Sequence, residues 1–155
     1  MASLKCFYTN ARSIRNNFNE LQLYMTSEDL DIVVITESWI NETLLGDRIQ
    51  YYDLAGYDKF VYQRKERIGG GVLIYDKKTL GPFEMHNINS REDIESLWID
   101  IFPGPSRNVK IRLGAFYRPP NQSRETDLAM IDEIERGIIN NTVLLGDFNL
   151  RGLLT

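Results

Sequence analysis

The sequence contains only one cysteine, Cys6, and one histidine, His86, in 155 residues. A single cysteine cannot form an internal disulfide, so the composition favours a reducing, intracellular compartment. The first ten residues contain no apolar segment of the kind found in secretory signal peptides. No stretch approaches the roughly 18 consecutive apolar residues that a membrane-spanning helix needs. The sequence therefore predicts a protein that is neither secreted nor embedded in a membrane.

The sequence also lacks the excess of positive charge that is typical of proteins that bind nucleic acid without specificity. Its formal net charge is −4 at pH 7. Charge therefore gives no support for a DNA partner. It does not exclude one, because a local cluster such as "RKER" at 64–67 acts within a Debye length of about 8 Å. An acidic balance also suits a site built from carboxylates and a metal.

The first third of the chain alternates between strand and helix patterns. Residues 4–8 alternate in polarity and predict a strand, and residues 13–25 have apolar side chains at helical spacing, with Ser13 as the N-cap. The run from Ile32 to Ile35 is continuously apolar, as expected for a strand covered on both faces. This order predicts a βαβ unit with two parallel strands.

The rest of the chain predicts short strands, one helix and a last strand. The strands are expected at 59–65, 69–78, 83–88, 95–102 and 108–117, with a turn at 103–108. Because few helical signals separate them, they predict a mostly antiparallel arrangement. A helix is expected over 126–139, with Thr126 as the cap and an apolar face formed by Leu128, Ile131, Ile134 and Ile138, followed by a strand at 142–145. The whole chain, residues 1–155, is expected to form one α/β (α+β) domain in which helices cover two packed sheets.

Polar side chains follow four of the predicted strands where each strand ends. Ligands of α/β sheets gather at the carboxyl ends of strands, so these positions are candidates for a site. Each also has a simpler explanation, namely a turn, a surface carboxylate, half-buried packing or an Asx-turn. The candidates are Asn10, Glu37, Tyr117, Arg118, Asp147 and Asn149.

Two other conspicuous features receive a structural interpretation. The glycine triplet at 69–71 predicts a loose turn or a bulge before a strand. His86 lies in the polar stretch "MHNIN" and is predicted to be a surface residue without a catalytic role.

Five segments, "TNARSI", "ITESW", "GGGVLIY", "YRPPN" and "LLGDFN", occur in this order along the chain. In sequence and spacing they resemble the endonuclease domain of non-LTR retrotransposons, a branch of the endonuclease/exonuclease/phosphatase superfamily. The "GDFN" segment is typical of the superfamily, and "NARSI" with "YRPPN" is typical of the retroelement branch. The resemblance extends from Leu4 to Leu150 and implies a four-layer α-β-β-α sandwich of two mixed sheets.

The resemblance also implies a role for the residues at the strand ends. Glu37, with help from Asn10, corresponds to the ligand of a divalent metal, normally Mg²⁺ and alternatively Mn²⁺. Tyr117 corresponds to the tyrosine that contacts the scissile phosphate. Asp147 corresponds to the aspartate that orients or deprotonates the attacking water, and Asn149 to the asparagine that holds this water and the phosphate oxygens. Mg²⁺ fits this set because it prefers oxygen ligands and needs only one or two carboxylates.

The residues beside these positions allow two further predictions. Arg118 directly follows Tyr117, and from its charge and place we expect it to pair with a phosphate oxygen of the nucleic acid. Phe148 stands between Asp147 and Asn149, and we expect its side chain to point the other way, into the core.

The sequence departs from the family at its end. The family normally continues beyond "GDFN" to further strands and a terminal "SDH" segment, whose aspartate and histidine assist metal binding and stabilise the pentavalent phosphate. After Asn149 only "LRGLLT" follows. We therefore expect a domain that is incomplete at its C-terminus, lacks its last strands and has weak or no activity. The open sheet edge predicts self-association.

The function implied by the resemblance is a Mg²⁺-dependent DNA endonuclease that nicks target DNA for retrotransposition. Its partners would be DNA and, in a full-length element, a reverse-transcriptase domain, and it would act in the nucleus. Two alternatives stay open: a truncated remnant that folds or binds without catalysis, and a phosphatase or lipid phosphodiesterase of the same superfamily. The "YRPPN" segment and the absence of membrane features argue against the second alternative.

Overall fold

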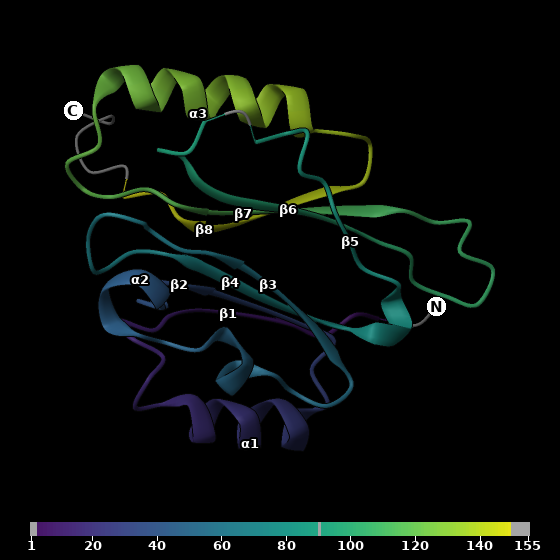
Figure 1. The fold of residues 1–155 in the computed structure, drawn as a ribbon. Coiled ribbons are helices and arrows are strands. Elements are labelled where there is room, and N and C mark those ends of the chain that lie inside the picture. Colours follow the sequence, from purple (N-terminus) through teal and green to yellow (C-terminus); the bar gives the residue numbers. More distant parts are fainter. Residues whose placement is uncertain (1–2, 90, 150–155) are drawn as a thin grey trace.

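The computed structural model describes residues 3–89 and 91–149, which form two packed sheets with helices outside them (Figure 1). In chain order the elements are β1 (Cys6–Asn10), α1 (Phe18–Glu28), β2 (Ile32–Thr36), α2 (Glu42–Leu45), the 3₁₀ helix η1 (Ile49–Tyr52), β3 (Tyr57–Tyr62), β4 (Val72–Lys77), the 3₁₀ helix η2 (Lys78–Leu80), β5 (Phe83–Glu84), β6 (Glu95–Ile101), β7 (Ile111–Tyr117), α3 (Arg124–Gly137) and β8 (Thr142–Asp147).

Both sheets are mixed and contain four strands in the described part of the chain. The first has the order β1-β2-β4-β3, and the second has the order β5-β6-β7-β8. Each contains one parallel pair, β1 with β2 and β7 with β8, and its other pairs are antiparallel. Helix α1 covers the outer face of the first sheet and α3 covers the outer face of the second (Figure 1). The predicted βαβ unit and the four-layer arrangement are therefore confirmed.

Three apolar clusters fill the spaces between these layers. Strand β2 explains why its sequence is apolar without alternation: Ile32 and Val34 face the other sheet, whereas Val33 and Ile35 pack under α1. A strand covered on both faces favours apolar side chains at consecutive positions. The third cluster lies between the second sheet and α3 and contains the fully buried Trp98.

The predicted boundaries at the N-terminal end need correction. Strand β1 ends at Asn10, two residues later than expected, so this side chain belongs to the strand end itself. Helix α1 begins at Phe18, and the predicted cap Ser13 instead lies in the preceding loop with φ +89°. The backbone N–H of Ser13 donates to the carbonyl of Glu37. Because this bond holds Ser13 against the end of β2, the helix starts several residues later.

The predicted helix near the C-terminal end exists, but its cap and its buried face are different. Ser123, and not Thr126, is the N-cap of α3, and its hydroxyl accepts a hydrogen bond from the Thr126 N–H. Leu128 and Ile131 are exposed, whereas the buried face includes Glu133. The physical reason is that the Glu133 carboxylate accepts hydrogen bonds from two residues of β6, Ser96 and Trp98.

None of the helices in the described part of the chain combines the length and apolar character needed to cross a membrane.

Candidate active site

The two parallel strand pairs end at the same edge of the sandwich and place polar side chains there. Two hydrogen bonds cross from one sheet to the other at this edge. The Asn10 Nδ2 donates to Oδ2 of Asp147 over 3.0 Å, and the Tyr117 hydroxyl donates to Oε1 of Glu37 over 2.6 Å. Tyr117 and Asp147 are also register partners on β7 and β8. Four residues from four separate strand ends therefore form one cluster.

A fifth side chain supports this convergence of the two carboxylates. The Tyr8 ring on β1 lies beside the cluster, and its hydroxyl is 2.9 Å from the hydroxyl of Thr36. Burial raises the pKa of the Tyr8 phenol, and the charges of Asp147 and Glu37 add to this rise. Both carboxylates therefore lie near the same ring, in a region of concentrated negative charge.

Glu37 occupies a strained position directly after β2. Its φ is +51°, which is uncommon for a residue with a side chain, and its carbonyl accepts a 2.9 Å hydrogen bond from the Ser13 N–H.

The Tyr117 phenol is held in its protonated form. Burial, and to a lesser extent the hydrogen bond to Glu37, raises the pKa of the Tyr117 phenol above its usual value. Tyr117 is therefore a neutral hydrogen-bond donor near pH 7.

The turn after β8 explains the spacing of Asp147 and Asn149. The Asn149 N–H donates to Oδ1 of Asp147 over 3.2 Å, so the predicted Asx-turn is present together with the cluster. Phe148 points away from the cluster, as predicted, and its ring stacks on Phe116 with 5.9 Å between the centroids. The alternation of two polar residues around a phenylalanine thus serves the site and the core at once.

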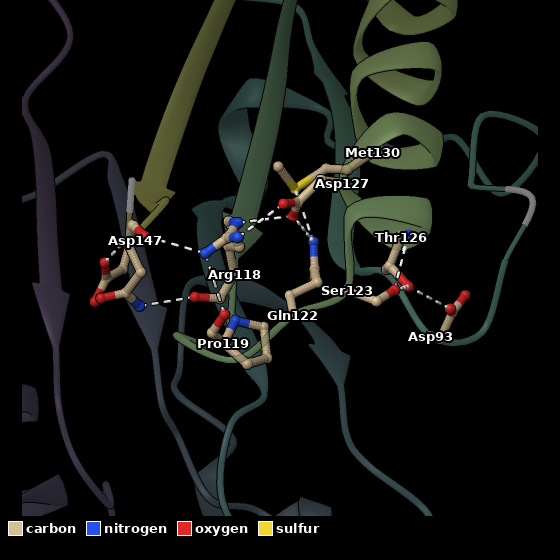
Figure 2. A network of polar contacts seen from close by, with 10 residues as sticks. Asp93, Arg118, Pro119, Gln122, Ser123, Thr126, Asp127, Met130 and Asp147 are labelled. Carbon is tan, nitrogen blue, oxygen red and sulfur yellow. Dashed lines mark hydrogen bonds and ion pairs between the residues drawn. The ribbon is translucent and has the colours of Figure 1, made fainter. Parts of the chain in front are cut away.

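Arg118 lies beside the cluster, and its donors have partners within the protein. Its guanidinium pairs with Asp127 of α3 through Nε–Oδ1 and Nη2–Oδ2 contacts of 2.7 and 2.8 Å, which Figure 2 shows. Its Nη1 donates to the Asn149 carbonyl over 3.0 Å, and the Asn149 Nδ2 donates to the Arg118 carbonyl over 2.7 Å. This arginine is buried, and its donors hold Asn149 and Asp127 in this structure. The predicted phosphate contact would need one of these donors to change partner, and it stays a prediction.

Sequence reasoning missed a second arginine, on the other side of the site. The Arg64 guanidinium makes two hydrogen bonds with Glu95, of 3.1 and 2.7 Å, and lies 5.8 Å from the centroid of the Tyr117 ring. Glu95 also accepts a 2.7 Å hydrogen bond from the Gly71 N–H. The available signal was a glutamate at the start of the strand "ESLWI", whose other residues are mostly apolar, because a charged residue in such a segment indicates a buried and paired charge.

The glycine triplet has a definite role in this arrangement. A Cβ atom on Gly70 would lie 2.3 Å from Oε1 of Glu95, and the residue has φ +62°. Only glycine meets both conditions without strain. At the predicted turn, the backbone at Gly70 therefore passes close to the side chains of Arg64 and Glu95.

The donor atoms of the cluster suit a hard divalent cation. Carboxylate and amide oxygens of Glu37, Asp147 and Asn10 are ligands of the kind that Mg²⁺ prefers. The described residues contain no group of three or more histidine, cysteine, aspartate or glutamate side chains that could enclose a metal by themselves. Two carboxylates and one amide oxygen suit Mg²⁺, which needs only one or two carboxylates and retains several of its waters. His86 is not part of this site, because its side chain is 80% exposed and lies 3.5 Å from Glu84, as expected for a surface residue.

Comparison with solved structures shows that other proteins share this fold. The endonuclease domain of TRAS1, a telomere-specific non-LTR retrotransposon, is 16% identical with a TM-score of 0.69, and the match covers 97% of this chain and 61% of that one. The AP endonuclease LMAP from Leishmania major is 15% identical (TM-score 0.66; 92% and 53% covered). The 3′ phosphatase NExo from Neisseria, bound to a product DNA hairpin, is 15% identical (TM-score 0.63; 95% and 58% covered).

These similarities concern the fold alone, because the identities are low. The chain spans between 53% and 61% of the length of these three structures. No curated protein sequence matches it. The sequence pattern of the endonuclease/exonuclease/phosphatase family, in contrast, matches residues 8–153, almost the whole chain. The chain therefore belongs to the endonuclease/exonuclease/phosphatase family.

Proposed function

We propose that the chain is the metal-dependent part of a DNA endonuclease, which hydrolyses a phosphodiester bond and leaves a nick. The single observation that supports this most is the pair of cross-sheet hydrogen bonds, Asn10 with Asp147 and Tyr117 with Glu37. They gather two carboxylates, an amide and a neutral phenol at one edge. A phosphodiester is anionic, so its hydrolysis needs such a combination of metal-binding oxygens, a base and hydrogen-bond donors.

Each residue has a distinct task in this proposal. Glu37 and Asn10 hold Mg²⁺, which acts as a Lewis acid that stabilises negative charge in the transition state. Asp147 orients the attacking water and accepts its proton, while Asn149 holds the same water. The water oxygen forms the new bond to phosphorus, the ester P–O bond opposite it breaks, and the departing alkoxide takes a proton from solvent. Tyr117 exchanges Glu37 for a phosphate oxygen as the acceptor of its hydrogen bond and keeps its proton. This exchange of partners needs a protonated phenol, which agrees with the raised pKa of Tyr117.

The retroelement branch supplies the biological setting of the proposal. The segments "NARSI" and "YRPPN" and the fold shared with the TRAS1 endonuclease domain support target-DNA nicking during retrotransposition. The partners would then be nuclear DNA and a reverse-transcriptase domain. The fold shared with a 3′ phosphatase keeps phosphate-monoester hydrolysis as a second candidate, since the same cluster suits both substrates.

A metal-binding titration tests the cluster without relying on catalysis. We expect the chain to bind Mn²⁺, seen as loss of the electron paramagnetic resonance signal of the free ion, and Glu37→Gln to weaken binding about tenfold or more. Glu28→Gln is the matched control, because this exposed glutamate on α1 makes the same charge change at the other end of the first sheet. Equal affinities of the Glu37→Gln and Glu28→Gln variants would disprove the proposed metal site.

A nicking assay on supercoiled plasmid with Mg²⁺, and with EDTA as the control, tests the activity of this chain. We expect weak or no nicking, because the 155 residues contain no "SDH" segment and the sole histidine lies on the surface. Loss of one preorganised electrostatic group commonly lowers kcat by about 10²–10³-fold. Efficient nicking that Asp147→Asn abolishes would support the nuclease but contradict the expected weakness. Release of phosphate from a 3′-phosphorylated oligonucleotide would favour the second candidate.

A further inference from the structure

Three connections meet beside Glu37: those between β1 and α1, between β2 and α2, and between β3 and β4. The Ser13 N–H donates to the Glu37 carbonyl over 2.9 Å, and the Trp39 N–H donates to the Gly70 carbonyl over 3.0 Å. The central connection is thus fixed to a neighbour on each side. These bonds fix the backbone of one rim of the candidate site.

Trp39 stands out from this rim. Its neighbours Ser38 and Ile40 are buried, whereas Trp39 is 37% exposed with φ +58°. A residue with a side chain in this region of φ is held there by its surroundings. An indole partly open to water also leaves apolar surface unburied. The fixed backbone therefore leaves the Trp39 ring partly exposed to solvent and not buried in the core.

Two exposed guanidinium groups belong to the connections on either side. Arg12, with φ +45°, precedes Ser13 in the first connection, and Arg67 lies in the third. The carbonyl of Arg67 accepts a 3.3 Å hydrogen bond from Nδ2 of Asn41, which ties its backbone to the central connection. Within the described part of the chain, neither guanidinium forms a hydrogen bond or an ion pair. The rim thus combines an open aromatic ring with two cations that have no anionic partner.

We propose that this rim binds single-stranded or locally opened DNA, with an unpaired base stacked on Trp39 and the neighbouring phosphates paired with Arg12 and Arg67. Every base has a π-face, so stacking of this kind tolerates different sequences. The inference rests on the proposed function, and it adds a subsite for a nucleotide beside the scissile phosphate. Two residues of extended chain span at most about 7 Å, so the Trp39 backbone lies within that distance of Glu37.

Tryptophan fluorescence reports on this subsite directly. The chain has two tryptophans, the exposed Trp39 and the fully buried Trp98. In EDTA, where metal-dependent cleavage is absent, we expect oligothymidylate to quench part of the emission. An abasic oligomer of equal length has the phosphates without the bases, so it should quench little and bind more weakly. In the Trp39→Phe variant only the buried Trp98 emits, so the oligothymidylate should no longer quench the fluorescence.

Fluorescence anisotropy of a labelled oligothymidylate measures the affinity of the variants. We expect Trp39→Ala to raise Kd about fivefold or more, and Trp39→Phe, which retains a ring, to raise it less. Phe83→Ala is the control, because it removes an exposed aromatic ring far along β6 from the site. Phe83 pairs with Asp100 near one end of β6, whereas Glu95, at the other end of β6, pairs with Tyr117 of the site. The Phe83→Ala variant should leave Kd unchanged. The double variant Arg12→Gln, Arg67→Gln should bind both the thymidylate and the abasic oligomer more weakly.

The outcomes separate this inference from the proposed function. Equal affinity and quenching for the abasic and thymidylate oligomers, or an unchanged Kd for Trp39→Ala, would overturn the stacking subsite. Neither result affects the Mn²⁺ titration of Glu37→Gln, which tests the metal site alone. Conversely, thymidylate quenching through Trp39 in a chain whose Mn²⁺ affinity is insensitive to Glu37 would support the subsite and reject the proposed catalysis.

Discussion

At the scale of single residues, Asp76 is the most unusual member of the core. It follows Val72 and Ile74 on the face of β4 that points towards the second sheet, and it is fully buried. In the described part of the chain, neither carboxyl oxygen has a hydrogen-bond partner. Burial, and secondly the charge of Asp58 opposite it on β3, raises the pKa of Asp76 to about 7. Folding therefore favours the protonated, neutral form.

This residue gives the fold a pH dependence of known sign. The unfolded chain binds this proton only below about 3.8, whereas the folded chain keeps it up to about pH 7. The contribution of this carboxyl to stability is therefore fully present below the lower value and declines as the pH rises from about 4 to 7. Three pH units at about 1.4 kcal/mol each set an upper bound of about 4 kcal/mol on the loss.

Urea unfolding of the wild type and of Asp76→Asn at several pH values measures this loss. The amide cannot ionise, so the variant should lose less stability between pH 4 and 7 than the wild type does. Asp58→Asn is the matched control, because removing that charge should move the decline to lower pH without abolishing it. Identical pH profiles for the wild type and Asp76→Asn would show that this carboxyl is not the cause.

The candidate site shows what residue types at strand ends predict and what they do not. The sequence placed Asn10, Glu37, Tyr117 and Asp147 at strand ends, and the structure brings them together because parallel strands have their carboxyl ends at one edge. Their roles stay predictions. The ion pair of Arg118 was not predicted, because spacing does not reveal that its side chain faces Asp127 on α3. The Arg64–Glu95 pair was missed, because its members are 31 residues apart and meet only through the packing of two sheets.

At the scale of elements, α3 shows how tertiary contacts override an apolar periodicity. The sequence has two competing faces: the apolar one with Leu128 and Ile131, and the one that is buried, which includes Met130 and Glu133. The second is favoured because Glu133 accepts hydrogen bonds from β6. A periodicity count treats a glutamate as a surface residue and therefore selects the wrong face.

The C-terminal turn of α3 provides a mutational test of this packing. A Cβ atom on Gly137 would lie 2.4 Å from the ring of Trp98. Glycine to alanine in a helix normally stabilises a protein by about 0.5–1 kcal/mol. Here we expect the clash to outweigh that gain, and Gly137→Ala to destabilise the protein by about 1–3 kcal/mol, measured by thermal unfolding. Leu128→Ala on the exposed face should have little effect, and a raised Tm for Gly137→Ala would contradict the packing.

At the scale of the whole molecule, the sequence predicted the layers better than the order of the strands. The order of strand, helix and strand at the N-terminal end predicted one parallel pair, which the structure confirms. The second parallel pair, β7 with β8, was not predicted. The division of the antiparallel middle, with β3 and β4 in one sheet and β5 to β7 in the other, was not predicted. Pairings such as β2 with β4 join segments far apart in the chain, and local patterns contain no information about them.

The edges of the two sheets lead to the last prediction. In the described part of the chain, β8 pairs only with β7, and Val143 on this six-residue edge strand is exposed. The edge strand β5 at the other side of the same sheet has only two residues. Long apolar edges present unpaired backbone groups that template pairing with another chain, whereas short edges do not. Within the second sheet, we therefore propose that β8, and not β5, is the edge through which the chain self-associates.

Size-exclusion chromatography with light scattering tests this proposal. We expect the wild type to form dimers or larger species and Val143→Lys to shift the distribution towards monomer, because a lysine on an edge strand opposes strand addition. Val109→Lys adds the same charge at an exposed valine outside the strands, between β6 and β7, and should leave the distribution unchanged. Circular dichroism must show that both variants remain folded, so that a change in mass reflects the edge alone. A monomeric wild type, or equal dissociation by both lysines, would mean that β8 does not mediate association.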